Sequence, residues 1–292
     1  MLMENQTIFN SANNAEPFLK WAGGKRQLLE EIEAHLPEKF GNYIEPFLGG
    51  GAAFFHLYNN GFLKHKITLI DNNPELVNTY IIVKNKAEEL LLLLENFKKS
   101  YLKDPHDFYY KLRNWDRQPD YYRRSSIEKA ARTIFLNKTC FNGLYRVNSK
   151  GFFNVPLGRY KNPNIFNRQN ILSVSEALKN TDIICDDFSI CLKMAKAGDF
   201  IYFDPPYFPI SETSCFTGYT KEEFGADQQK RLRDTFAKLS CRRCFLMLSN
   251  SSADFIKNLY KDFNIFEVEA KRFINCVSEG RGPIKELIIT NY

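Results

Sequence analysis

The 292-residue chain lacks the long hydrophobic segments that a membrane protein or a secretory leader requires. The run of leucines from Leu90 to Leu94 is far too short to cross a bilayer, and glutamates flank it on both sides. The first twenty residues are polar and contain no continuous apolar stretch. We therefore expect a cytoplasmic protein that has no membrane partner.

Cysteine and histidine are too few and too scattered for a disulfide framework or a metal site. The seven cysteines are an odd number without regular spacing, and Cys241 and Cys244 are the only close pair. All four histidines lie far from that pair in the sequence. We expect reduced thiols and no bound metal.

Acidic residues are absent from a long part of the chain. None occurs between Glu128 and Glu176, and the segment from Lys99 to Lys161 holds 14 Lys and Arg against 5 Asp and Glu. That segment has a net charge of +9, whereas the whole chain has +6. A segment of one sign favours a polyanionic partner. A basic surface that is merely solvated remains the alternative.

Apolar strands and amphipathic helices alternate at both ends of the chain, which is typical of an α/β protein with a parallel sheet. The last two strands have no clear helix between them and predict an antiparallel hairpin, so the whole sheet is expected to be mixed. The seven predicted strands lie at 43–45, 66–70, 183–185, 200–203, 245–248, 265–268 and 287–290.

The alternation stops between about Glu95 and Asn170, where two helices and a turn-rich run rich in Asn, Gly, Arg and Pro are expected. We predict that this basic segment is inserted into the sheet domain. The expected division is 1–78 plus 168–292 for the sheet domain and 79–167 for the insertion.

Asp204-Pro205-Pro206-Tyr207 follows the apolar strand 200–203, at the sheet edge where open α/β folds bind ligands. Two prolines stiffen the turn and remove two N–H donors, so the turn presents acceptors. An acid beside a rigid carbonyl suits an amine with two hydrogens, and would stabilise positive charge developing on that nitrogen. An ordinary proline-rich turn with a capping aspartate is the alternative.

Three consecutive glycines, Gly49 to Gly51, follow the strand at 43–45 and precede a helix, so the backbone can approach a ligand at a helix N-terminus. The spacing differs from that of dinucleotide and triphosphate loops. About 20 residues further on, Asp71 ends the next strand, where an acid accepts hydrogen bonds from ribose hydroxyls. A helix N-cap ahead of Pro74 is an equally good explanation of Asp71.

Two further runs contain candidate binding residues. In Phe18 to Lys25, Trp21 and Lys25 could hold the carboxylate and stem of an amino acid, although a turn with a core tryptophan explains them equally well. In the run 137–159, Arg146 could pair with a guanine and Asn142 with a base edge, and Phe141 could fill the gap left by a flipped base. A polar surface hairpin is the alternative there.

The order of these motifs along the chain, with the cofactor motifs first, the run 137–159 next and the acidic turn last, resembles that of the Dam family of DNA adenine-N6 methyltransferases (D12 class, alpha group). The resemblance covers nearly the whole chain. The resemblance implies a Rossmann-like, seven-stranded mixed sheet of the S-adenosylmethionine-dependent type, with an inserted helical and hairpin DNA-recognition domain. It implies methyl transfer from S-adenosylmethionine to N6 of a flipped adenine in duplex DNA, with 5′-GATC as the target. We expect a monomer, and an association with a restriction system stays open.

The resemblance also implies roles for individual residues. The catalytic motif is Asp204, Pro205, Pro206 and Tyr207; the cofactor residues are Trp21, Lys25, Glu45, Phe47, Gly49, Gly51, Asp71, Asp187, Phe188 and Asp204; and the DNA-binding residues are Lys20, Phe141, Asn142, Leu144, Arg146, Pro156 and Arg159. Cys140 and the pair Cys276-Val277 depart from the family pattern, which affects details of the DNA contacts.

Two other functions stay open at this point. An RNA adenine-N6 methyltransferase would have the same fold and cofactor, but the long basic hairpin favours a duplex. A catalytically inactive DNA-binding regulator would not need the intact acidic turn and glycine loop. A dinucleotide oxidoreductase is disfavoured by the glycine spacing and the basic insertion.

Overall fold

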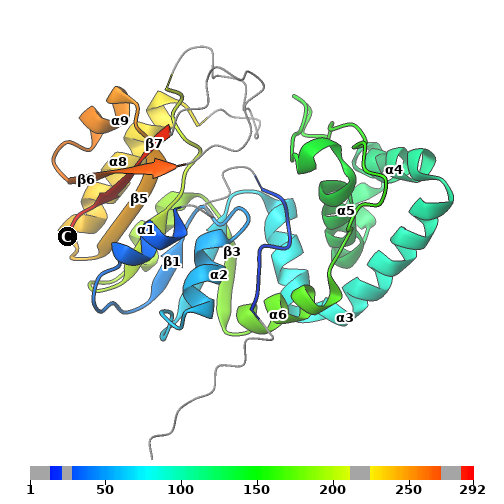
Figure 1. Ribbon diagram of the computed structural model, residues 1–292, viewed down its shortest axis with the longest axis horizontal. Helices are drawn as coiled ribbons and strands as arrows, with labels where there is room; N and C mark the ends of the chain where they lie inside the picture. The colour runs from blue at the N-terminus through cyan, green and yellow to red at the C-terminus, as the bar shows by residue number, and fades with distance from the viewer. Residues whose placement is uncertain (1–13, 22–27, 211–223, 271–283) are drawn as a thin grey trace, which may run out of the picture.

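In the described part of the chain, seven strands form one mixed sheet, which confirms the predicted fold class (Figure 1). The computed structural model describes residues 14–21, 28–210, 224–270 and 284–292. The strand order is β3-β2-β1-β4-β5-β7-β6, with β7 antiparallel to both of its neighbours and the other pairs parallel. The strands are β1 (Tyr43–Glu45), β2 (Ile67–Asp71), β3 (Thr181–Cys185), β4 (Phe200–Phe203), β5 (Phe245–Ser251), β6 (Asn264–Ala270) and β7 (Ile284–Thr290).

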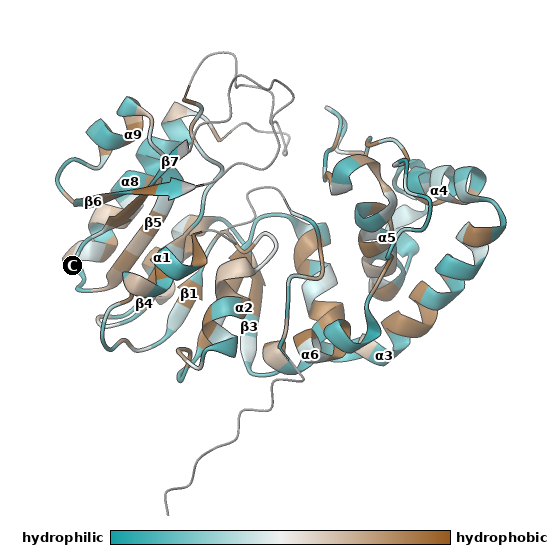
Figure 2. Cartoon of the chain, in the orientation of Figure 1, coloured by the Kyte–Doolittle hydropathy of each residue, from teal (hydrophilic) through white to brown (hydrophobic). Residues whose placement is uncertain are grey.

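The central strands are hydrophobic on both faces because helices cover both sides of the sheet. Along β1 and β4, Tyr43 and Phe200 belong to one buried cluster, and Ile44 and Ile201 belong to the cluster on the opposite face. Figure 2 shows these strands as the hydrophobic centre of the sheet. This double burial explains why the sequence shows short continuous apolar runs there.

Helices from two parts of the chain form the two covering layers. Buried residues of α1 (Leu29–Ala34), α2 (Ala52–Asn59) and α6 (Arg168–Leu178) join the first cluster. Buried residues of α7 (Cys191–Met194), α8 (Ala226–Cys241) and α9 (Asp254–Leu259) join the second.

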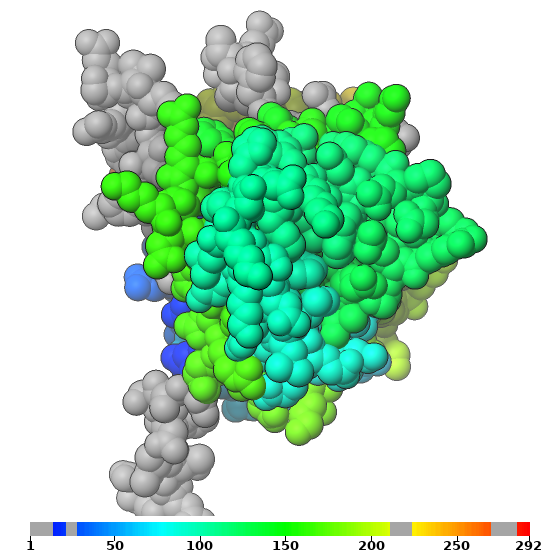
Figure 3. Space-filling view, turned by 90° about the vertical axis from the view of Figure 1, so that its right-hand side faces the viewer, coloured from blue at the N-terminus to red at the C-terminus, as the bar shows by residue number. Residues whose placement is uncertain are grey.

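Long helix α3 (Pro74–Lys103) starts beside the sheet and continues into a helical lobe with α4 (Pro105–Arg113) and α5 (Ser126–Thr139) (Figure 1). Figure 3 shows this lobe end-on, where α3, α4 and the segment after α5 make one continuous surface. Short 3-10 turns complete the chain at Asn114–Arg117, Tyr121–Arg123, Phe141–Gly143 and Phe188–Ile190.

The helical lobe and the sheet share one hydrophobic core. Phe135 of α5 and Leu90 of α3 belong to the same buried cluster as Tyr43 of β1. The predicted boundary after residue 78 falls inside α3, whose single non-helical residue is Lys86 (φ −141°, ψ 37°). The division into two domains therefore stays a prediction, and α3 is kinked at Lys86 between the sheet and the lobe.

Candidate active site

The carboxyl ends of the parallel strands bring the predicted acidic residues to one edge of the sheet. Glu45 ends β1, Asp71 ends β2, and Asp204 follows β4. Strand β1 lies between β2 and β4, where the chain order reverses direction across the sheet. Open α/β sheets bind their ligands at such a point.

Asp204 is oriented by a chain of two hydroxyls. Its Oδ1 accepts a hydrogen bond from the Ser249 hydroxyl at 2.8 Å, and the Ser249 Oγ lies 2.9 Å from the Tyr202 hydroxyl oxygen. A serine has a single hydroxyl proton, so Ser249 donates to Asp204 and accepts from Tyr202. This arrangement fixes the carboxylate without neutralising its charge.

The proline turn after Asp204 is braced from two neighbouring elements. Gln229 of α8 donates to the Pro206 carbonyl at 2.9 Å, and Asn250 of β5 donates to the Gln229 side-chain oxygen at 3.1 Å. The Tyr207 hydroxyl donates to Glu286 of β7 at 2.9 Å. Sequence reasoning missed these supports and Ser249. The polar triplet Ser249 to Ser251, which ends an otherwise apolar strand, is the signal that could have indicated them.

The glycine loop is shaped by close contacts that leave no room for side chains. Gly49 and Gly51 have φ values of +48° and +71°, which favour glycine. The Tyr80 hydroxyl donates to the Gly49 carbonyl at 3.2 Å, and a Cβ on Gly51 would lie 2.9 Å from that hydroxyl oxygen. The loop thus reaches helix α2 in one fixed conformation.

Asp71 holds the glycine loop, and the helix cap is a different residue. Its two carboxylate oxygens accept the N–H groups of Gly49 at 3.0 Å and Asn73 at 2.9 Å. The N-cap of α3 is Asn73, whose side chain accepts from the N–H groups of Glu75 and Leu76. The alternative explanation of Asp71 as that cap is therefore wrong. Each oxygen of Asp71 retains acceptor capacity for a hydroxyl.

Glu45 is buried at the end of β1, with only 2% of its surface exposed. Its carboxylate accepts the Tyr43 hydroxyl at 2.8 Å. Burial raises the pKa of Glu45 to about 8, and the negative charge of Asp204 contributes in the same direction. Burial at this edge of the sheet thus disfavours the ionised form of Glu45.

Three phenylalanines and an acid form the neighbouring part of the site. Phe47 stacks on Phe188 with ring centroids 5.4 Å apart, and Phe224 packs edge-on against Phe47 at 5.5 Å. Asp187 accepts the N–H of Ser189 at 3.0 Å and pairs with Arg231 at 2.5 Å. Phe224 and Arg231 were not predicted from the sequence, since they lie on and before α8, far along the chain.

These residues match the chemistry of S-adenosylmethionine. Asp71 offers acceptors for ribose hydroxyls, and Phe47 and Phe188 offer aromatic faces beside the Asp187 carboxylate. Trp21 lies directly on the glycine loop, since a Cβ on Gly49 would be 2.9 Å from its Cδ1 atom. The predicted cofactor residue Lys25 lies outside the described residues.

The predicted recognition hairpin is anchored by one buried asparagine. Asn137, the first residue of the run 137–159, belongs to the last turn of α5 and is only 1% exposed. Its side chain accepts the N–H of Lys20 at 2.8 Å and donates to the carbonyls of Lys20 at 2.7 Å and Gly143 at 3.1 Å. These hydrogen bonds bring Lys20 beside the hairpin, although it precedes Asn137 by 117 residues in the sequence.

The hairpin itself closes through two isolated antiparallel bridges, Cys140 with Leu157 and Val147 with Phe153. Its outward residues are those predicted to contact DNA. Phe141 is 46% exposed, and Asn142 has a left-handed backbone (φ 54°). Asn142, Arg146, Pro156, Arg159 and Lys20 are also exposed, whereas Leu144 is half-buried.

Some of the basic residues make contacts within the helical lobe and are not available to a partner. Arg132 is 4% exposed, pairs with Asp116 at 2.7 Å and donates to the carbonyls of Leu112 and Arg113. The Arg124 guanidinium lies 3.8 Å from the centre of the Trp115 ring. The sequence alone does not separate such buried arginines from the exposed ones that could contact a polyanion.

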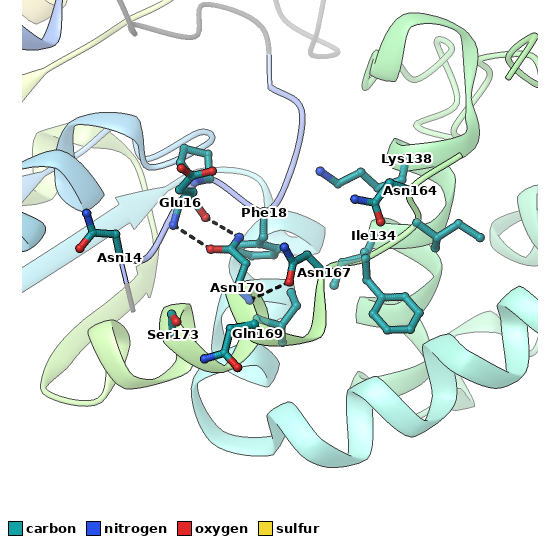
Figure 4. Close-up of a pocket in the computed structure, with 14 residues that line it drawn as sticks. Asn14, Glu16, Phe18, Ile134, Lys138, Asn164, Asn167, Gln169, Asn170 and Ser173 are labelled. Carbon is teal, nitrogen blue, oxygen red and sulfur yellow. Dashed lines mark hydrogen bonds between the residues drawn. The ribbon is translucent and has the colours of Figure 1, made fainter. Parts of the chain in front are cut away.

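A pocket of about 390 Å³ lies beside the lobe and is distinct from the glycine loop. Figure 4 shows Lys138 and Asn164 on one side of it, facing Glu16 and Asn170. The Asn170 side chain exchanges two hydrogen bonds of 2.9 Å with the Glu16 backbone. This pocket marks the joint between the N-terminal segment and α6. Burial and the charge of Lys20 lower the pKa of Lys138 to about 8.

Neither a metal cluster nor a membrane span is found among the described residues. No group of three or more potential metal-ligating side chains occurs in them. No helix in this part of the chain is both long and apolar enough to cross a bilayer. Cys140, Cys185, Cys191, Cys241 and Cys244 are free thiols.

Comparisons with known proteins agree with this geometry. The family model of the D12 class N6 adenine-specific DNA methyltransferases matches residues 21–274. The Type II methyltransferase M1.LlaDCHI of Lactococcus lactis subsp. cremoris is 48% identical over 96% of both chains. The Type II methyltransferase M.MjaIII of Methanocaldococcus jannaschii is 48% identical over 95% of this chain and 99% of its own. A DNA adenine methylase of Haemophilus influenzae is 35% identical over 93% and 92% of the two chains.

The family match confirms the resemblance that the motifs carry, and it favours the DNA enzyme over the RNA enzyme and the inactive regulator. Members of this family use S-adenosylmethionine as the methyl donor, which confirms the predicted cofactor. The chain belongs to the D12 class of N6 adenine-specific DNA methyltransferases, and it transfers a methyl group from S-adenosylmethionine to adenine in DNA.

Proposed function

We propose that the enzyme methylates the adenine of 5′-GATC in duplex DNA after flipping that adenine out of the helix. The observation that carries this proposal is the exposed hairpin, in which Phe141, Asn142 and Arg146 project from a buried anchor at Asn137. Protein groups reach base edges in this way when they read the major groove. The choice of GATC rests on the likeness of these residues to the Dam recognition hairpin.

Arg146 is preoriented for base recognition. Its Nε donates to the Asn154 side-chain oxygen at 2.8 Å, which leaves the two terminal nitrogens for the O6 and N7 acceptors of a guanine. Leu144 and Pro156 would contact the central A·T pairs, and Arg159 with Lys20 would contact the outer part of the site. Phe141 would fill the space of the flipped base, helped by Asn142.

The flipped adenine would be held at the acidic turn. The Asp204 carboxylate and the Pro205 carbonyl would accept the two hydrogens of its amine, and Tyr207 would stack on its ring. Hydrogen bonds from the amine to these two acceptors favour its pyramidal form and stabilise the positive charge that develops on nitrogen. The cofactor supplies an electrophilic methyl carbon. Trp21, Asp71, Phe47, Phe188 and Asp187 would orient it against the amine, with Lys25 and Gly49 to Gly51 completing its site.

An assay of methyl transfer tests this proposal. Purified protein with labelled cofactor should label a GATC duplex at adenine N6, and should label neither a GTAC duplex nor single-stranded RNA. Asp204→Ala should abolish transfer while retaining DNA binding. Asp182→Asn is the matched control, because that aspartate is exposed and pairs with Lys66 at the far side of the sheet. Label on another sequence would overturn the GATC target, and full activity of Asp204→Ala would overturn the site.

Arg146→Ala tests the recognition hairpin separately. Loss of a bidentate contact to guanine costs roughly 1–3 kcal/mol of discrimination. The variant should therefore methylate duplexes altered at one guanine nearly as well as GATC, which a competition assay between the two duplexes measures. Unchanged discrimination would argue against this residue as the guanine contact.

We also propose that the enzyme acts as a cytoplasmic monomer and modifies DNA for a restriction system. The support for the restriction role is the 48% identity to two proteins named Type II methyltransferases. Sedimentation of the free protein tests the monomer. A neighbouring gene for an endonuclease that cuts the unmethylated target tests the partnership, and an endonuclease of a different target would contradict it.

A further inference from the structure

Trp21 packs directly against the glycine loop. A Cβ on Gly49 would lie 2.9 Å from Cδ1 of Trp21, and a Cβ on Gly50 would lie 3.2 Å from its Cβ atom. The indole is thus in contact with the backbone that shapes the cofactor site. Any shift of Trp21 changes the room available to that loop.

Tyr145 of the hairpin stacks on Trp21. Their ring centroids are 5.1 Å apart with an interplanar angle of 28°. Tyr145 also packs against Phe153 on the opposite arm of the hairpin, with centroids 5.8 Å apart. Tyr145 therefore belongs to the hairpin on one side and to the cover of the glycine loop on the other.

The hydroxyl end of Tyr145 lies near Asn73, a residue that is linked to the glycine loop through Asp71. Burial raises the pKa of Tyr145 to about 12, and the nearby Asn73 side chain acts in the opposite direction. The N–H of Asn73 donates to Asp71, and the other oxygen of Asp71 accepts the N–H of Gly49. Tyr145 is thus connected to Gly49 through its stacking contact with Trp21.

We propose that Tyr145 is a positioning residue that couples DNA recognition by the hairpin to cofactor binding at the glycine loop. This proposal rests on the proposed function, in which the adjacent Leu144 and Arg146 contact bases. A hairpin fixed by DNA fixes the Tyr145 ring, which fixes Trp21 and the loop. By thermodynamic linkage, DNA then raises the affinity for the cofactor by the same factor as the cofactor raises the affinity for DNA.

Calorimetry with S-adenosylhomocysteine, an unreactive product, measures this coupling with and without a saturating unmethylated GATC duplex. The wild-type affinity should rise on the order of tenfold when the duplex is added. In Tyr145→Leu, which keeps an apolar side chain but loses the ring, that rise should shrink by about two- to tenfold, the worth of one stacked aromatic pair. Tyr145→Phe should restore the coupling if the ring carries it.

Tyr122→Ala is the matched control, because this tyrosine lies in the same lobe and is 70% exposed. Its coupling should equal that of the wild type. An undiminished rise in Tyr145→Leu would overturn the proposal. So would an equal loss of cofactor affinity with and without DNA, because that result describes a residue that only supports the loop. Partial coupling in Tyr145→Phe assigns the remainder to the hydroxyl and supports the proposal.

Failure of the GATC target has a different signature. Wild-type protein would then bind a GATC duplex no better than a scrambled duplex, and the coupling is measured with the sequence that the enzyme methylates instead. If wild-type protein shows no rise in cofactor affinity with that sequence either, the proposal for Tyr145 is wrong.

Discussion

At the residue scale, the acidic turn depends on side chains that touch Asp204 without reaching a substrate. The carboxylate is oriented by Ser249, which is held in turn by Tyr202. The turn itself is held by Gln229 through the Pro206 carbonyl. Such positioning groups are expected to change the rate of the chemical step more than the binding of DNA, because they set where one acceptor points.

Ser249→Ala should lower kcat about tenfold and leave the KM for DNA nearly unchanged. The expected size corresponds to a positioning loss of about 1.4 kcal/mol at the transition state. Single-turnover rates with a saturating duplex measure this effect. Ser175→Ala is the control, since that hydroxyl donates to the Lys84 carbonyl on the covering helices and contacts no site residue in the described hydrogen bonds. A wild-type rate for Ser249→Ala would show that Asp204 is held by its other contacts.

At the element scale, the carboxylate of Asp116 connects the helical lobe to the hairpin. Asp116 accepts from Arg132 of α5 at 2.7 Å and from the N–H of Phe153 in the hairpin at 2.8 Å. Both charged side chains are nearly buried, with 5% and 10% of Arg132 and Asp116 exposed. Removing one partner of such a pair leaves an uncompensated buried charge.

Asp116→Ala should destabilise the protein by about 3 kcal/mol, because Arg132 loses its counter-charge and Phe153 loses its acceptor. Chemical denaturation followed by circular dichroism gives the free energy of unfolding. Asp120→Ala supplies the comparison, since Asp120 is an exposed acid of the same lobe. A difference below about 1 kcal/mol between the unfolding free energies of the two variants would show that the buried pair contributes little to stability.

At the scale of the whole molecule, the charge distribution and the comparisons agree on DNA. The relatives are similar over nearly all of their own length, so the helical lobe and the sheet occur together in them. The exposed cations Lys20, Arg146 and Arg159 belong to the hairpin side of the lobe, and the half-buried Lys138 lies next to Lys20. Two lysines in mutual repulsion are relieved by a phosphate between or beside them.

The affinity for DNA should fall as the pH rises through about 8, the lowered pKa of Lys138. Below that pH Lys138 is charged and attracts phosphate; above it the side chain is neutral and the attraction is lost. Lys138→Arg should flatten this pH dependence, because a guanidinium stays charged throughout. Fluorescence anisotropy with a labelled duplex between pH 7 and 9 at constant salt measures it. An equal pH dependence in the variant would assign the titration to another group.

The sequence alone determined the sheet, the acidic turn and the glycine loop, because each depends on local chemistry. Apolar runs of four or five residues predict buried strands, two prolines stiffen a turn, and consecutive glycines permit positive φ angles. The order of these motifs along the chain was sufficient to recognise the family. The role of Asn137 was not predicted, because this polar and yet buried residue belongs to a helix and holds Lys20 from a distant part of the chain.

Only the tertiary structure decided which groups support the site and which charges are free. Ser249, Gln229 and Glu286 come from three elements that meet at Asp204 to Tyr207 only after the sheet has formed. Tyr145 meets Trp21 across more than a hundred residues of sequence, and Arg132 is buried although it belongs to the basic segment from Lys99 to Lys161. Contacts between distant segments depend on the packing of the whole chain, and no local pattern of residues encodes them.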